Sequence, residues 1–424
     1  MLELGVIADD LTGGVMVASL LEREGVRCPL VTSVEALAKL DDDAEAVVIG
    51  RKIRLSPHDQ AVADASRSAQ GLLARQAKRI YYKYSALFMS TEKGNIGPIS
   101  EKLMTLTGAD HVLFCPKWRN ATVYLGRLFV NDKMLHETAT SRDPVTPMTN
   151  SNLVEVLQSQ SQVDVGLLPL RVLYSAKPTA EEFLAERISN GTPFFIVDAI
   201  ESEHLTRVAE LVADSPLSTG ADELPIFLAR HWQQGQRKNK PRTLLPPAPG
   251  YEAVLAGSCS PKSNRQLNAF EQQHPLFRVD LLQAAKDPNT IDNIIRWAAD
   301  KLIEGPVGIA TTTDHAGVQR AQTVLGRQGA SDLAEDIFSR LSTDLHKLGV
   351  RKFVVAGGET SGKVIGALGI DQLEVASFDY LGGGYCHAGG VDPISLVTKA
   401  GGAGEEDFYV AALHRMRAAD AAGN

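Results

Sequence analysis

The 424-residue sequence has only four cysteines, and they lie far apart. Because no C-x-x-C pair brings two of them together, the sequence predicts neither a zinc site nor a disulfide framework, and it fits a reducing cytoplasm. An excess of basic residues is also missing, since 43 Lys and Arg stand against 51 Asp and Glu and the net charge is −8. We therefore expect no nucleic-acid partner.

Long apolar runs are missing as well. No uninterrupted apolar stretch is long enough to cross a bilayer, and the N-terminal MLELGVIADDL has no basic segment followed by an apolar core. We expect a cytoplasmic protein that is not secreted and has no membrane partner. The ten histidines show no H-x-x-x-H or other ligand spacing, so we expect no metal ion held by the protein itself.

Short apolar runs alternate with amphipathic stretches along the chain. Runs such as LGVIADD, EAVVIG and RIYYKYS are typical of buried parallel strands, and the stretches between them have the composition of helices. This alternation predicts an α/β protein whose domains are each a mainly parallel sheet flanked by helices. Charge, Pro and Gly concentrate at 236–250, which predicts an N-terminal domain at 1–235, a linker at 236–250 and a C-terminal domain at 251–424.

Small and hydroxyl-bearing residues follow several strands of the second half. Ligands of open α/β sheets bind beyond the carboxyl ends of the strands, and small residues there allow main-chain N–H groups to approach a phosphate. The segments are Gly257-Ser258-Cys259-Ser260, Thr311-Thr312-Thr313 and Gly357-Gly358-Glu359-Thr360-Ser361-Gly362, with KAGGAGEEDF later in the chain. They indicate a nucleotide site. Neither a Walker motif nor a G-x-G-x-x-G is present, so these residues alone do not specify which nucleotide is bound.

The strand ends of the first half carry charge instead. Asp9 and Asp10 follow the first apolar run, basic residues including Arg54 follow the next, and Lys83 ends a third. Cations and hydroxyls suit a small anionic, hydroxylated ligand, and a carboxylate can orient or deprotonate a hydroxyl. Asp is also a good helix cap, so we expect one of the two aspartates to cap a helix and the other to face the ligand.

Several motifs, taken in order, resemble the four-carbon acid sugar kinase family, once known only as a domain of unknown function. The resemblance covers nearly the whole chain and rests on IADDLTGG, KGNIGP, TVYLGRLFVND, LHETATSRDPVTPMTNSNLVEVLQ, GSCSPKSNRQL, GGETSGKVIGALGI and KAGGAGEEDFYVAAL. The segment TPMTNSNLVEVLQSQ is most similar to the branch that contains 3-oxo-tetronate kinases.

The resemblance implies a kinase whose N-terminal domain binds an acid sugar, whose C-terminal domain binds ATP with Mg²⁺, and whose active site lies in the interdomain cleft. It leaves a homodimer open. It assigns Asp10 to catalysis. The residues that it implies for substrate binding are Asp9, Asp10, Arg54, Lys83, Tyr84, Ser85 and Ala86. Those that it implies for ATP binding are Ser258, Gly357, Gly358, Glu359, Thr360, Ser361, Gly362 and Gly401.

Two positions depart from the pattern of the family. Met16 and Met89 stand where an acid is common, so either the pocket accepts a different acid sugar or activity is weakened. The resemblance implies the branched 3-oxo-isoapionate, a substrate of related kinases in this family, as a candidate beside 3-oxo-tetronate, and a pocket with less charge would suit it. A non-catalytic nucleotide- or metabolite-binding homologue is the alternative, whereas an NAD-dependent dehydrogenase is disfavoured because no G-x-G-x-x-G follows an N-terminal strand.

Overall fold

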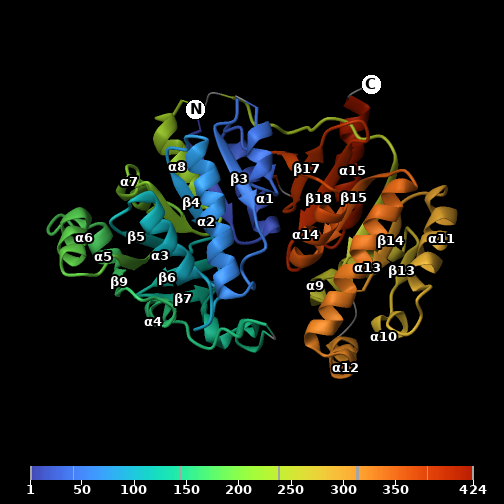
Figure 1. Ribbon diagram of the computed structural model, residues 1–424, viewed down its shortest axis with the longest axis horizontal. Helices are drawn as coiled ribbons and strands as arrows, with labels where there is room; N and C mark the ends of the chain where they lie inside the picture. Colours follow the sequence, from blue (N-terminus) through green and yellow to red (C-terminus); the bar gives the residue numbers. More distant parts are fainter. Residues whose placement is uncertain are drawn as a thin grey trace. The chain divides into compact units, whose positions relative to one another are not determined.

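The computed structural model describes residues 2–41, 43–143, 145–236, 239–311, 315–379 and 381–422. They form two compact units, Met1–Pro241 and Arg242–Asn424, and this division falls inside the stretch 236–250. In Figure 1 each unit consists of strands with helices packed around them. The predicted α/β fold with mainly parallel sheets flanked by helices is confirmed for both units.

The first unit is built on a parallel sheet with the strand order β2, β3, β1, β4, β11, β5, β10, β9. These strands are β1 (Leu4–Ala8), β2 (Leu30–Val31), β3 (Ala46–Gly50), β4 (Ile80–Lys83), β5 (Val112–Cys115), β9 (Val165–Leu168), β10 (Phe194–Val197) and β11 (Leu217–Gly220). An antiparallel sheet is formed by β6 (Ala121–Tyr124), β7 (Arg127–Val130) and β8 (Lys133–Met134).

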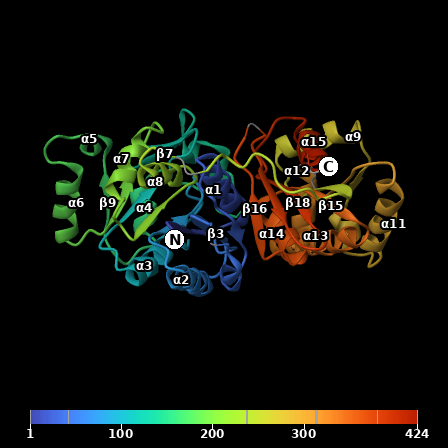
Figure 2. The ribbon, with the colours of Figure 1, turned by 90° about the horizontal axis from the view of Figure 1, so that it is seen from above.

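The helices of this unit lie on both faces of its parallel sheet. In Figure 2, α2 and α3 lie on one side of the strands and α7 and α8 on the other. The α-helices are α1 (Leu11–Arg23), α2 (His58–Ala74), α3 (Ile96–Thr107), α4 (Leu153–Gln158), α5 (Leu170–Leu173), α6 (Ala180–Ser189), α7 (His204–Leu211) and α8 (Leu224–Gln233). The 3-10 turns are η1 (Glu35–Lys39), η2 (Leu135–Glu137) and η3 (Ala139–Arg142).

The second unit has the strand order β13, β14, β12, β15, β18, β17, β16, parallel from β13 to β18 and antiparallel beyond. Its strands are β12 (Tyr251–Ala256), β13 (Leu276–Arg278), β14 (Val307–Ala310), β15 (Val350–Ala356), β16 (Gln372–Val375), β17 (Gly384–Ala388) and β18 (Ile394–Lys399). Its helices are α9 (Pro261–Glu271), α10 (Leu281–Ala284), α11 (Thr290–Leu302), α12 (His315–Leu325), α13 (Arg327–Lys347), α14 (Gly358–Ala367) and α15 (Phe408–Ala422). Figure 2 shows α13 and α14 on one side of these strands and α9 and α15 on the other.

The central strands form because their sequences are apolar on both faces. Every residue of β1 (LGVIA) and of β3 (AVVIG) is buried, as expected for a parallel sheet that helices cover on both sides. The helix that follows β1 begins where Asp10, in an extended conformation, accepts a hydrogen bond from the N–H of Gly13 at 2.7 Å. In the second unit Ser260 caps α9 in the same way and Pro261 follows it as the first helical residue. Both caps lie at the carboxyl ends of strands.

Candidate active site

Five charged side chains gather at the carboxyl edge of the sheet in the first unit. Strands β1 and β11 both pair with β4, and the last residue of each lies opposite Lys83, the last residue of β4. Side chains that leave these three strands therefore meet at one place. We call the group the acid–cation cluster, and its members are Asp9, Asp10, Arg54, Lys83 and Asp222.

Arg54 holds the two aspartates that follow β1. Its Nε and Nη2 donate to the two carboxylate oxygens of Asp9 at 2.7 and 2.8 Å, and Nη2 also lies 2.8 Å from Oδ2 of Asp10. Asn95 keeps the main chain of this loop in place, since its amide donates to the carbonyl oxygens of Ile53, Arg54 and Ser56 at 2.9, 3.3 and 2.9 Å. The guanidinium is thus positioned both through its carboxylate partners and through its own backbone.

Lys83 lies among three carboxylates. Its Nζ is 3.9, 3.5 and 3.6 Å from the nearest oxygens of Asp9, Asp10 and Asp222, and its side chain is only 3% exposed. With every member ionised, three carboxylates and two cations give the cluster a formal charge of −1. Such a group is suited to hydroxyl and oxo groups, because its carboxylates can accept from hydroxyls while its cations donate to oxygen.

Asp10 and Asp222 differ in proton affinity. Burial alone would raise the pKa of Asp10, but Arg54, Lys83 and the N–H of Gly13 together hold that pKa well below its ordinary value. In contrast, burial raises the pKa of Asp222, and the attraction of Lys83 does not outweigh burial and the repulsion of the neighbouring aspartates. Asp10 is therefore a firmly ionised anion, whereas Asp222 holds a proton more readily.

The residues that follow Lys83 differ in burial and in what they contact. The Tyr84 ring is fully buried, packs 5.4 Å from the Phe88 ring and has its hydroxyl 3.2 Å from Oγ1 of Thr219. Ser85 and Ala86 are half-buried in the turn after the strand. The main chain of this segment therefore continues directly from the cluster, but the Tyr84 side chain belongs to the core.

Two residues near the cluster were not singled out from the sequence. A Cβ on Gly13 would lie 1.8 Å from Nζ of Lys83 and 2.4 Å from Oδ1 of Asp10, so only glycine lets Lys83 approach the start of α1. Asp222 lies two residues beyond β11, whose sequence LSTG is too short and polar to predict a buried strand. Had that strand been identified, Asp222 would have appeared as another strand-end acid.

In the second unit, three neighbouring strands end beside one another. The N–H of Gly257, after β12, donates to the carbonyl of Ala356 in β15, and the N–H of Gly357 donates to the carbonyl of Lys399 in β18, at 2.9 and 3.0 Å. A Cβ on Gly401 would lie 2.3 Å from Oγ of Ser258, so the Gly401 loop contacts the Ser258 turn directly. The structure thus brings together the predicted residues Ser258, Gly357 and Gly401.

The predicted GGETSG turn forms the start of α14. Gly357, with φ of +122°, precedes the helix, and Ser361 donates to its carbonyl through both N–H and Oγ, at 2.9 and 2.8 Å. The first-turn N–H groups point out of the helix and carry the positive end of its dipole, which favours an anion. Gly358, Glu359 and Thr360 make up this first turn, whereas Gly362 has open space beside it.

Two hydroxyls and one lysine hold the Gly401 loop. Ser260 and Ser263 donate to the Gly401 carbonyl oxygen at 2.7 and 3.1 Å, and Nζ of Lys399 lies 3.3 Å from the same oxygen. Lys399 is 1% exposed, and burial, with a smaller contribution from Lys262, lowers its pKa to about 8. The predicted strand end Thr311 is described, but Thr312 and Thr313 lie outside the described residues.

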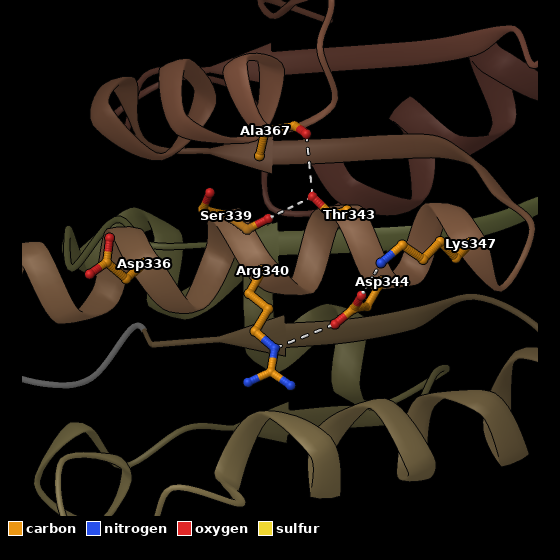
Figure 3. Close-up of a pocket in the computed structure, with 7 residues that line it drawn as sticks. All are labelled: Asp336, Ser339, Arg340, Thr343, Asp344, Lys347 and Ala367. Atoms are coloured by element: carbon orange, nitrogen blue, oxygen red, sulfur yellow. Dashed lines mark hydrogen bonds and ion pairs between the residues drawn. The ribbon is translucent and has the colours of Figure 1, made fainter.

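A further depression lies away from these strand ends. It has a volume of about 720 Å³ and is formed mainly by α13, with Arg340, Asp344 and Lys347 on its wall (Figure 3). Lys347 ends α13 shortly before β15 begins at Val350, so this part of the helix faces the amino edge of the sheet. Ligands of such sheets bind at the carboxyl edge, and the depression is therefore no candidate active site.

Within the described ranges, no three His, Cys, Asp or Glu side chains are grouped so that they could hold a metal ion. Among the helices of those ranges, none is long and apolar enough to span a membrane.

The chain matches two family models that together cover most of its length. Residues 4–224 match a sugar-binding N-terminal domain and residues 253–409 match a nucleotide-binding C-terminal domain. The acid–cation cluster lies in the first match, and the strand ends around Ser258, Gly357 and Gly401 lie in the second.

Full-length relatives agree with these models. The chain is 36% identical to the 3-oxo-tetronate kinase of Pseudomonas fluorescens over 97% of both chains and 34% identical to that of Burkholderia multivorans over the same shares. Among solved structures it is similar to a Salmonella typhimurium protein, with 30% identity, a TM-score of 0.84 and coverage of 97% of this chain and 98% of that one. A Haemophilus influenzae protein matches with 30% identity and a TM-score of 0.75 over 97% and 99%. The chain therefore belongs to the four-carbon acid sugar kinase family and is a phosphotransferase of that family.

Proposed function

We propose that this chain transfers the γ-phosphoryl group of ATP to a terminal hydroxyl of a small 3-oxo acid sugar. The observation that carries the proposal is the acid–cation cluster inside the sugar-binding match, because its alternating acceptors and donors suit a short, densely oxygenated molecule. The relatives named 3-oxo-tetronate kinase make 3-oxo-tetronate the first candidate substrate.

The proposed substrate roles follow from the hydrogen-bonding capacity that each side chain has left. Arg54 and Lys83 donate to the carboxylate or the neighbouring oxygens of the acid sugar, and Asp9 keeps Arg54 in place. Asp10, with 26% of its side chain exposed, accepts from the attacking hydroxyl and fixes its direction. Tyr84, Ser85 and Ala86 contribute through their main chain, since the Tyr84 side chain is buried in the core.

The nucleotide roles are assigned to the carboxyl edge of the second unit. The residues present fit a polyphosphate, because the start of α14 offers main-chain N–H groups to an anion, and Gly357 and Gly401 let the strand ends around Ser258 lie close together. The residues assigned to it are Ser258, Gly357, Gly358, Glu359, Thr360, Ser361, Gly362 and Gly401. ATP brings the phosphoryl group, and a Mg²⁺ ion carried by its phosphates neutralises their charge. ATP as donor also favours action in the cytoplasm.

Catalysis in this scheme is mainly positioning. Phosphoryl transfer requires an oxygen nucleophile held in line with the γ-phosphate and little covalent chemistry from the protein. Arg54 and Lys83 orient the acid sugar, and Asp10 aims the hydroxyl. The main-chain N–H groups at the start of α14 hold the phosphates, and the Gly401 loop keeps its shape through Ser260, Ser263 and Lys399.

The branched 3-oxo-isoapionate is the second candidate substrate. Met16 in α1 and Met89 after the Lys83 segment are both half-buried, and neither thioether can accept a hydrogen bond as strongly as a carboxylate. A pocket with two fewer acids gives less charge and more apolar surface to the substrate, which favours a branched acid over a linear one.

An ADP-release assay over a panel of acid sugars tests the proposal. We expect ATP-dependent turnover with 3-oxo-tetronate or 3-oxo-isoapionate and much lower rates with the unoxidised acids. The site of phosphorylation, read by NMR of the product, should be the terminal hydroxyl. Binding of ADP without turnover on any member of the panel would contradict the kinase function and favour a non-catalytic homologue.

A further inference from the structure

Asp222 is the acid of the cluster that has the fewest partners. It lies beyond β11, is 7% exposed, and has Nζ of Lys83 as its ionic partner at 3.6 Å. Throughout the described residues, no N–H or O–H group donates a hydrogen bond of ordinary geometry to its carboxylate. The Asp222 carboxylate therefore keeps acceptor positions that the described donors do not use, although the group is buried.

The other two acids of the cluster are occupied. Both oxygens of Asp9 accept from Arg54. Oδ1 of Asp10 accepts from the N–H of Gly13 at 2.7 Å, and its Oδ2 lies 2.8 Å from Arg54. Asp10 is a weak base, because despite its burial Arg54, Lys83 and the N–H of Gly13 hold its pKa well below the ordinary value.

We propose that Asp222 accepts the proton of the attacking hydroxyl, while Asp10 only orients that hydroxyl. The inference rests on the proposed kinase function and assigns a proton acceptor to the same site. Lys83 links the two acids, since its Nζ lies 3.5 Å from Asp10 and 3.6 Å from Asp222. A hydroxyl that accepts a hydrogen bond from Lys83 is therefore within reach of both carboxylates.

The proposed step is balanced. The O–H bond of the substrate breaks and its proton passes to the carboxylate of Asp222, while the oxygen forms a bond to the γ-phosphorus of ATP. The bond between that phosphorus and the bridging oxygen breaks, and its electron pair leaves with ADP. Asp222 then returns the proton to water when the products leave.

The charged groups around Asp222 set the pH range in which Asp222 can act as a base. Lys83 reaches it from β4, Asp9 and Asp10 from the end of β1, and Arg54 from the loop after β3. Burial raises the pKa of Asp222, and the repulsion of the two aspartates adds to it while the cations oppose it. A group with a raised pKa must lose its proton before it can act as a base, so activity should rise with pH through that raised value. Tyr81 on β4 also faces this place, but burial keeps its pKa well above the ordinary value and it stays neutral.

The test compares pH profiles of kcat/KM for the acid sugar at saturating Mg·ATP in the full-length protein. In the wild type we expect an acidic limb above the ordinary pKa of a carboxyl. Asp222→Asn should lower kcat by about 10²- to 10⁴-fold and abolish that limb. Asp222→Glu keeps the carboxylate, so it should recover part of the rate and the limb. Asp214→Asn is the matched control on the same unit, because Asp214 is an exposed acid.

Asp10→Asn separates the two roles. It should lower kcat but retain the acidic limb, because Asp222 remains as the base. If Asp222→Asn keeps both the rate and the limb while the wild type is active, the assignment of Asp222 is wrong and the kinase function stands. If the wild type has no activity with any acid sugar, the kinase function and this inference are both overturned. Circular dichroism and thermal unfolding of each variant show whether a loss of activity is caused by a loss of folded structure.

Discussion

Replacing Gly13 by alanine should impair activity strongly and leave stability nearly unchanged. Its N–H donates to Asp10, and its missing side chain leaves the space that Lys83 occupies. A Cβ placed there would lie 1.8 Å from Nζ of Lys83, whereas such contacts are essentially never shorter than 3.0 Å. In Gly13→Ala the ammonium must therefore move by more than about 1 Å, and a misplacement of that size costs roughly 10²-fold in rate.

The same substitution has two opposing effects on the free energy of unfolding. Ala is favoured over Gly inside a helix by about 1 kcal/mol. The new Cβ would also lie 2.4 Å from Oδ1 of Asp10, and loss of an N-cap costs about 0.5 to 2 kcal/mol. These terms nearly cancel, so we expect the midpoint of thermal unfolding to shift by only a few degrees while kcat/KM falls about 10²-fold.

Steady-state kinetics and thermal unfolding of Gly13→Ala and Gly14→Ala give the measurement. Gly14 is the matched control, because its Cβ would approach Val48, Ala8 and Leu30 at 3.1 to 3.2 Å and would not touch the cluster. Gly14→Ala should therefore affect stability more than catalysis. Wild-type kcat/KM in Gly13→Ala would refute the argument that the position of Lys83 matters. A large loss of stability would show that the cap dominates.

Three further predictions concern binding. Gly401→Ala should weaken ADP binding at least about tenfold in calorimetry, since its Cβ would lie 2.3 Å from Oγ of Ser258. Gly402 has open space beside it, so the Gly402→Ala variant should bind ADP with wild-type affinity. Equal affinities of the two variants would remove Gly401 from the nucleotide site. Arg54→Ala should lower kcat/KM for the acid sugar by about 10²-fold with ATP affinity unchanged, and an equal fall in ATP affinity would make the residue structural. A bound polyphosphate should raise the pKa of Lys399 from about 8, so ADP binding at pH 8 should be accompanied by proton uptake. Calorimetry in buffers of different ionisation enthalpy detects this uptake. Lys399→Met should abolish it, and proton uptake that persists in the variant would assign it to another group.

Much of the architecture could be predicted from local patterns. Strands such as β1, β3 and β15 are continuous apolar runs that end in polar or glycine residues, and the helices between them have regular apolar spacing. Strands β11, β17 and β18 are among those that were not predicted from the sequence. The four residues LSTG of β11 are buried only because β4 and β5 flank them on both sides, so their strand character comes from tertiary pairing.

The sequence by itself determined the fold class, the charged strand ends of the first unit, the glycine-rich strand ends of the second, and the resemblance to a kinase family. These features depend on residue type and spacing, which neighbouring residues along the chain decide. The tertiary structure alone decided that Asp10 caps α1 and is bound to Arg54, that Tyr84 lies in the core, and that Asp222 joins a cluster 139 residues after Lys83 in sequence. Proton affinity and available partners depend on burial and on charges within a few ångströms, and chain positions that far apart acquire such neighbours only when the sheet has formed.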